Sequence, residues 1–163
     1  EIRLMGARLT LAALLVMLDQ ASKLAVLRLL EPYQTIPLVP GFNLTLAFNR
    51  GASFSFLAEA GGWQRWLFSG IALAASVVIV ILLRRTPAAD RLNGLGLSLV
   101  LGGAIGNLID RLWLGHVVDF FDVYYRAWHF PAFNIADSAI SVGAALLVLG
   151  MWRQERATPQ SEP

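Results

Sequence analysis

The chain has 163 residues, enough for one domain, and 56% of them are hydrophobic while only 15% are charged. Soluble domains carry about 25% charged residues, so this composition argues against an ordinary soluble protein and indicates an integral membrane protein. The net charge of +2, without a basic cluster interleaved with stacking aromatics, argues against nucleic acid as a partner, and the lack of cysteine excludes disulfides and thiol nucleophiles.

Residues 9–30 form the first apolar segment, and its length suffices for a transmembrane helix, which needs about 20 residues. Asp19, Gln20 and Lys23 interrupt it before apolar residues resume to Leu30. Because Asp19 and Lys23 are four positions apart, they share one helix face and can form an ion pair. Two interpretations stay open: the pair allows a polar helix to insert, or it braces a functional site.

Residues 31–65 differ from the rest of the chain because three prolines rule out a long helix. Apolar and polar residues alternate over 42–49, which predicts a short strand with one apolar face. The turn-forming sequence 49–51 follows, and residues 53–59 are expected to form a short surface helix. We therefore expect 31–65 to be a small lobe outside the membrane.

Three further transmembrane helices are expected over 66–83, 92–113 and 136–152. Gly102 and Gly106 in the third helix are spaced for close helix packing. The aromatic stretch 120–133 is typical of a membrane interface, and the polar tail from about 155 to 163 is expected to be disordered. The fold class predicted is thus an all-α membrane protein with four transmembrane helices and a small β-containing lobe, forming a single domain over 1–163.

Four spans place both termini on one side of the membrane. The short arginine-rich loop 84–91 and the basic residues near both termini indicate that this side is the cytoplasm. The lobe 31–65 would then lie on the outer face, together with the boundary that carries Asp119 and Asp137.

These two aspartates are the strongest candidates for chemistry, because an ionisable side chain at the edge of an apolar run is energetically costly. The only histidines, His116 and His129, lack metal-ligand spacing, so no metal and no other cofactor is expected. Two carboxylates held close together share a proton, so that one activates water while the other protonates the leaving group. Structural roles remain open: a helix N-cap for Asp137, with Asn134 or Ser138 as competitors, and an interfacial charge for Asp119. Asp110 is interpreted as a helix-end charge.

Five stretches of the chain, in order, resemble the lipoprotein signal peptidase, or signal peptidase II, family. They are LDQASK at 18–23, AFNRGASFSF at 47–56, GGAIGNLIDR at 102–111, GHVVDF at 115–120 and FNIADSAISVG at 133–143. The resemblance implies an aspartic endopeptidase of the bacterial inner membrane. Its substrate would be a prolipoprotein carrying a diacylglyceryl group, cleaved on the N-terminal side of the lipidated cysteine.

The resemblance also assigns roles to individual residues. Asp119 and Asp137 match the catalytic pair, and Asp19 and Lys23 match a supporting motif. The positions implied to bind substrate are Asn49, Gly51, Asn107, Arg111 and Asn134. We expect a monomer whose partners are the lipid-modified substrate and membrane lipids. The alternative function is a small polytopic protein that binds lipid or serves as an assembly subunit, in which these polar residues only stabilise packing.

Overall fold

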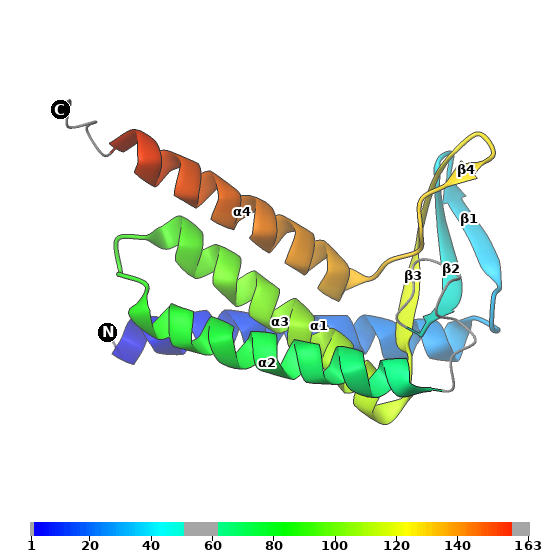
Figure 1. Cartoon of the computed structure of the whole chain (residues 1–163). Helices are drawn as coiled ribbons and strands as arrows, with labels where there is room; N and C mark the ends of the chain where they lie inside the picture. The colour runs from blue at the N-terminus through cyan, green and yellow to red at the C-terminus, as the bar shows by residue number, and fades with distance from the viewer. Residues whose placement is uncertain (1, 51–61, 158–163) are drawn as a thin grey trace.

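The computed structural model describes residues 2–50 and 62–157. Four long helices dominate it: α1 (Ile2–Leu29), α2 (Trp63–Arg85), α3 (Arg91–Trp113) and α4 (Ile135–Ala157). All four are long and apolar enough to cross a membrane, which confirms the predicted fold class. Figure 1 shows a sheet at one end of these helices, while the N-terminus, the α2–α3 loop and the end of α4 lie at the other.

The third helix is central, since α3 contacts each of the other three. Its small residues permit close approach: a Cβ added to Gly96 would lie 2.8 Å from the Gly143 carbonyl oxygen of α4. One added to Gly102 would lie 2.9 Å from the Ala12 carbonyl oxygen of α1, which confirms the predicted packing role of this glycine.

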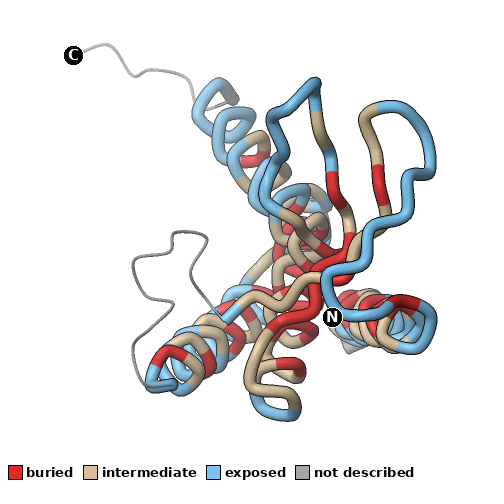
Figure 2. The backbone as a smooth tube through the Cα atoms, turned by 90° about the vertical axis from the view of Figure 1, so that its right-hand side faces the viewer, coloured by how far each residue is buried: buried red, intermediate tan, exposed pale blue. Residues whose placement is uncertain are grey.

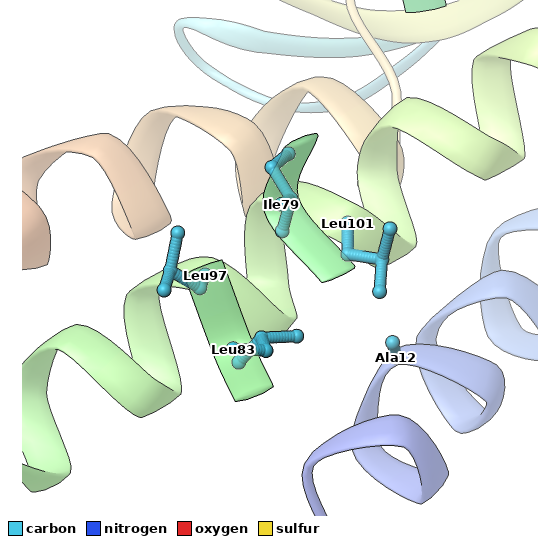
Figure 3. Packing of buried hydrophobic residues seen from close by; sticks show 5 residues of the cluster. All are labelled: Ala12, Ile79, Leu83, Leu97 and Leu101. Atoms are coloured by element: carbon cyan, nitrogen blue, oxygen red, sulfur yellow. The ribbon is translucent and has the colours of Figure 1, made fainter. Parts of the chain in front are cut away.

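An apolar core joins α1, α2 and α3 in the half of these helices away from the sheet (Figure 3). Its buried members are Ala12, Ile79, Leu83, Leu97 and Leu101. Many other apolar side chains on the helices are exposed, including Trp66, Val78 and Val148. Exposed apolar side chains on long helices suit contact with lipid chains instead of water.

Three helices extend clearly further than predicted: α1, α4 and α2, which runs over Trp63–Arg85 instead of 66–83. Helix α1 begins at Ile2 instead of 9, because Arg8 donates hydrogen bonds to carbonyls at the end of α2. Helix α4 continues to Ala157 instead of ending at 152, so the expected disorder of 155–157 is wrong. In this extension Gln154 hydrogen-bonds Asp90 and the Arg156 guanidinium lies 3.9 Å from the Trp152 ring centroid.

The sheet contains four antiparallel strands in the order β1-β2-β3-β4. They are β1 (Thr35–Val39), β2 (Phe42–Asn49), β3 (Val117–Tyr125) and β4 (Trp128–His129). The predicted strand 42–49 is confirmed as β2. The interfacial interpretation of 120–133 missed β3 and β4, because residues 117–120 are all buried and show no alternation. The expected helix over 53–59 lies outside the described residues.

The first half of β3 runs at the junction between the sheet and the helix ends. Val118 and Phe120 pack with Val26 and Leu30 at the end of α1 and with Leu46 of β2. Figure 2, seen from the sheet end, shows buried segments gathered at the centre of the molecule. Asp119, which lies between Val118 and Phe120, is therefore held on a rigid and buried strand.

Candidate active site

The N-terminus of α4 fixes Asp137. Asn134 caps the helix: its Oδ1 accepts the Asp137 N–H at 2.8 Å, while Asp137 Oδ2 accepts the Asn134 N–H at 3.2 Å. This reciprocal arrangement is a capping box. Asn134 is thus the N-cap that the sequence left in competition with Asp137. The other oxygen of Asp137, Oδ1, takes no part in the capping box and accepts a hydrogen bond from Asn107 Nδ2 at 2.8 Å.

Asp119 lies on β3 and is only 2% exposed. Its Oδ1 accepts a hydrogen bond from Asn134 Nδ2 at 2.7 Å, and the Asn49 side chain of β2 also bonds this carboxyl. Asn134 therefore contacts both aspartates, Asp119 through its amide nitrogen and Asp137 through its oxygen and backbone. One fully buried amide holds the two carboxyl groups beside each other.

This environment changes the acidity of Asp119. Burial raises the pKa of its carboxyl from the ordinary 3.8 to about 7, and the negative charge of Asp137 adds to the rise. Hydrogen bonds from Asn49 and Asn134 and the charge of Lys23 oppose that rise. A carboxyl with a pKa near neutrality can both hold and release a proton at physiological pH.

We expect this shift to appear in the pH dependence of stability. The raised pKa means that folding favours the neutral acid, so its stabilising contribution is complete below pH 3.8 and is lost as pH rises through about 7. Asp119→Asn should remove this contribution to the change of folding stability with pH. Thermal melting of both proteins from pH 5 to 8.5 checks it: the Tm difference, variant minus parent, should grow with pH. An unchanged difference would contradict the raised pKa.

A buried ionic network lies directly behind the pair. Lys23 Nζ is 2.8 Å from Asp19 Oδ2, 2.9 Å from Asp110 Oδ2 and 3.0 Å from Asn107 Oδ1, so its three donors all have partners. Asp19 also accepts the Ala136 N–H of α4 at 2.9 Å. The network therefore ties α1 to α3 and to the first turn of α4, and Asn107 links it to Asp137.

The interpretation of Asp110 as a helix-end charge is wrong. It is 1% exposed, and besides Lys23 it accepts the Val118 N–H of β3 at 3.0 Å and Gln20 Nε2 at 2.8 Å. The bond to Val118 fixes the backbone immediately before Asp119. The sequence did contain one indication that Asp110 belongs to the site: it lies three residues after Asn107, on the same helix face.

Arg111 is placed less directly than the other predicted residues. Its Nη1 donates to the Asn107 carbonyl at 3.3 Å, and its guanidinium lies over the Phe68 ring at 5.6 Å from the centroid. Within the described ranges it forms no ion pair, although its charge interacts with Asp137, Asp119 and Asp110. Gly51 lies outside the described residues. The remaining predicted site residues converge on one hydrogen-bonded network: Asp19, Lys23, Asn49, Asn107, Asp119, Asn134 and Asp137.

A cavity of about 560 Å³ opens beside Asp137. One side carries polar groups from Asn49, Asp137 and Ser138. The other side is apolar and includes Phe130, Phe133 and Val142. Across residues 2–50 and 62–157, no group of three or more His, Asp or Glu side chains is arranged to hold a metal ion. The arrangement presents the Asp137 carboxyl to a partly apolar cavity, while Asp119 is buried and bonded to the same Asn134.

The comparisons with known proteins agree with one another. The family model described as "Signal peptidase (SPase) II" matches residues 11–153. A lipoprotein signal peptidase of Aeromonas hydrophila subsp. hydrophila is 52% identical over 149 residues, covering 91% of this chain and 89% of that protein. One from Escherichia fergusonii is 48% identical over 152 residues, 93% of each chain. Two solved bacterial membrane enzymes match with TM-scores of 0.83 and 0.79 at 26% and 28% identity, covering 97% and 90% of this chain and 94% and 92% of theirs.

Proposed function

The chain belongs to the signal peptidase II family and removes signal peptides from prolipoproteins, and we propose that Asp119 and Asp137 are the two carboxyls that perform the hydrolysis. The observation that carries this assignment is the position of Asn134, which hydrogen-bonds both carboxyls at once. A single proton shared by such a pair supplies one base and one acid.

In the proposed reaction, the ionised carboxylate takes a proton from a water molecule as the water oxygen attacks the scissile carbonyl carbon. The neutral partner donates its proton to the amide nitrogen as the C–N bond breaks. The products are a carboxyl at the end of the signal peptide and a free amine on the lipoprotein. The pair still holds one proton, now on the carboxyl that began ionised, and transfer of that proton to the other carboxyl restores the starting state. Neither step needs a covalent enzyme intermediate.

The cavity beside Asp137 supports a lipid-modified substrate. An extended peptide backbone can bond Asn49 and Ser138, while the apolar side lined by Phe130, Phe133 and Val142 can accept part of the diacylglyceryl group. We propose that Arg111 and Asn107 keep the Asp137 carboxyl positioned for the reaction. Gly51 would complete the substrate site, as the family resemblance implies. Cleavage would then occur on the N-terminal side of the lipidated cysteine.

The direct test is a cleavage assay with the full chain purified in detergent. We expect it to process a diacylglyceryl-modified precursor and to leave the same precursor without its lipid almost uncut, because the apolar side of the cavity would be unfilled. Activity should persist in a strong chelator, because the two carboxyls supply both proton transfers. Loss of cleavage in chelator with recovery on adding zinc would reject the mechanism. No cleavage of the lipidated precursor by a folded chain would favour a lipid-binding or assembly role.

Four spanning helices and the family fit a protein of the bacterial inner membrane. We propose that both termini and the α2–α3 loop are cytoplasmic, with the site near the outer face and the whole chain acting as one monomeric domain. Arginines at 84, 85 and 91 support this orientation.

This orientation predicts the labelling of introduced cysteines, for which the chain offers a clean background because it has none of its own. Ala89 lies in the α2–α3 loop and Ala127 between β3 and β4, and both are exposed. In intact spheroplasts a membrane-impermeant thiol reagent should label Ala127→Cys and spare Ala89→Cys, and permeabilisation should make both react. The opposite labelling would invert the orientation.

A further inference from the structure

Two adjoining cavities lie at the end of the helices opposite the sheet, near the α2–α3 loop (Figure 1). Their volumes are about 390 Å³ and 220 Å³. Both are lined by Leu4, Arg8 and Ala88, so they form two parts of one hollow on either side of Arg8. The catalytic proposal uses none of these residues.

The hollow is strongly cationic. Arg84 and Arg85 line the larger part, Arg91 lines the smaller, and Arg8 lines both. No acidic side chain lines either part. In the described portion of the chain, none of these arginines has a carboxylate within ion-pair distance. Four guanidinium groups therefore surround a space without a counter-ion from the protein.

Arg8 is the unusual member of the four arginines, because its charged side chain is only 8% exposed. Its guanidinium donates to the carbonyls of Leu83 at 3.0 Å, Thr86 at 2.8 Å and Pro87 at 3.0 Å. These bonds orient the group but do not neutralise its charge. Its Nε has no acceptor among the described residues and faces Gly94, where an added Cβ would lie 2.7 Å from it. A guanidinium that is largely buried and has no carboxylate partner is costly unless an anion completes it.

The rest of the hollow is apolar. Leu4, Met5 and Leu83 line the larger part, and Leu11 and Leu95 line the smaller. These residues belong to helices long enough to span the membrane, so the hollow lies where a bilayer surface would meet them. A small inorganic anion would leave this apolar surface uncovered, whereas a ligand with a phosphate and hydrocarbon chains would use both features.

We propose that this hollow binds an anionic phospholipid, with the phosphate among Arg8, Arg84 and Arg91 and an acyl chain along Leu4 and Leu95. The site is separate from the catalytic aspartates, so it concerns the stability and lipid environment of the enzyme and not its chemistry. Basic residues at a membrane surface attract anionic lipids additively, which makes the two exposed arginines Arg84 and Arg91 the natural positions to test.

The experiment uses the full chain in a non-ionic detergent with three probes: phosphatidylglycerol, phosphatidylcholine with the same acyl chains, and inorganic phosphate. Native mass spectrometry counts the lipids retained, and thermal melting measures stabilisation. We expect phosphatidylglycerol to be retained and to raise Tm, and the other two to do neither. The double variant Arg84→Gln with Arg91→Gln should weaken phosphatidylglycerol binding about 10-fold or more.

The matched control is Arg153→Gln with Arg156→Gln, which removes two exposed arginines from the end of α4 that line neither cavity. It should retain phosphatidylglycerol like the parent, and both double variants should still cleave the lipidated precursor, which verifies that they are folded. Equal loss of binding in the control would show a diffuse charge effect and overturn the site. Equal stabilisation by inorganic phosphate, or by phosphatidylcholine, would overturn the assignment to an anionic lipid.

Discussion

Replacing either Asp119 or Asp137 by asparagine is expected to reduce cleavage at least about 100-fold, the usual contribution of a general acid or base. An amide can neither take the proton of the attacking water nor share a proton with the remaining carboxyl. The double variant should be little worse than either single one, because members of one catalytic unit are not additive. Turnover of a lipidated precursor, measured beside thermal melting, tests these expectations.

The two variants should differ in stability. Asp119→Asn removes a buried carboxyl whose ionised form is unfavourable, so stability at pH 8 should hold or rise. Asp137 accepts hydrogen bonds on both oxygens, from Asn107 and from the Asn134 N–H. An amide would place a donor against one of these donors, so Asp137→Asn should lose about 1 kcal/mol.

A suitable control for this pair is Asp122→Asn. Asp122 lies on the same strand as Asp119 and is also buried, but its partners are His129 at 2.7 Å and Asn43 at 2.8 Å. This variant should keep most of its activity. Substantial cleavage by either catalytic variant, or activity that only follows unfolding in all three, would reject the assignment of the pair.

Lys23→Met is expected to produce the largest loss of stability, about 3–5 kcal/mol. Lys23 is 2% exposed and is the cation shared by Asp19 and Asp110, so its removal leaves two buried carboxylates without a positive partner. Asn107 would also lose a donor to its oxygen. Cleavage should fall by more than the loss of folded protein, because Lys23 also bonds Asn107, the donor to Asp137, and its charge acts on Asp119.

Arg28→Met serves as the control, since Arg28 is on the same helix but exposed, and it should cost less than about 0.5 kcal/mol. Adding Asp19→Asn and Asp110→Asn to Lys23→Met should recover part of the lost stability, because no buried charge would then remain unpaired. A Lys23→Met protein that melts with the parent would show that the network does not stabilise the fold.

The sequence predicted the features that depend on local composition. Long apolar runs indicated the four helices, although charged residues interrupt the first, and β2 was recognised because its apolar and polar residues alternate. The strand β3 was not predicted, because both of its faces are buried at Val117 and Val118 and the sequence there does not alternate between apolar and polar residues. The start of α1 escaped because Arg8, a charged residue that would ordinarily mark a helix end, is instead held by carbonyls of α2.

The sequence indicated residues that the structure brings together, but not how they are connected. Family resemblance indicated Asp119, Asn134 and Asp137, yet only the structure shows that one amide joins the two carboxyls. The link from Lys23 to Asn107 crosses 84 positions of the chain, and no local pattern encodes such a contact. Asp110 was misjudged for the same reason, since its partners Lys23 and Val118 lie on other elements.

The capping box at the start of α4 has a consequence for biogenesis. Asp137 and its N-cap Asn134, whose amide bonds Asp119, both lie at the start of the last helix. A chain that has inserted only its first three helices therefore has Asp119 but lacks both Asp137 and Asn134. On the proposed assignment, docking of the first turn of α4 therefore completes both the helix packing and the carboxyl pair in one step.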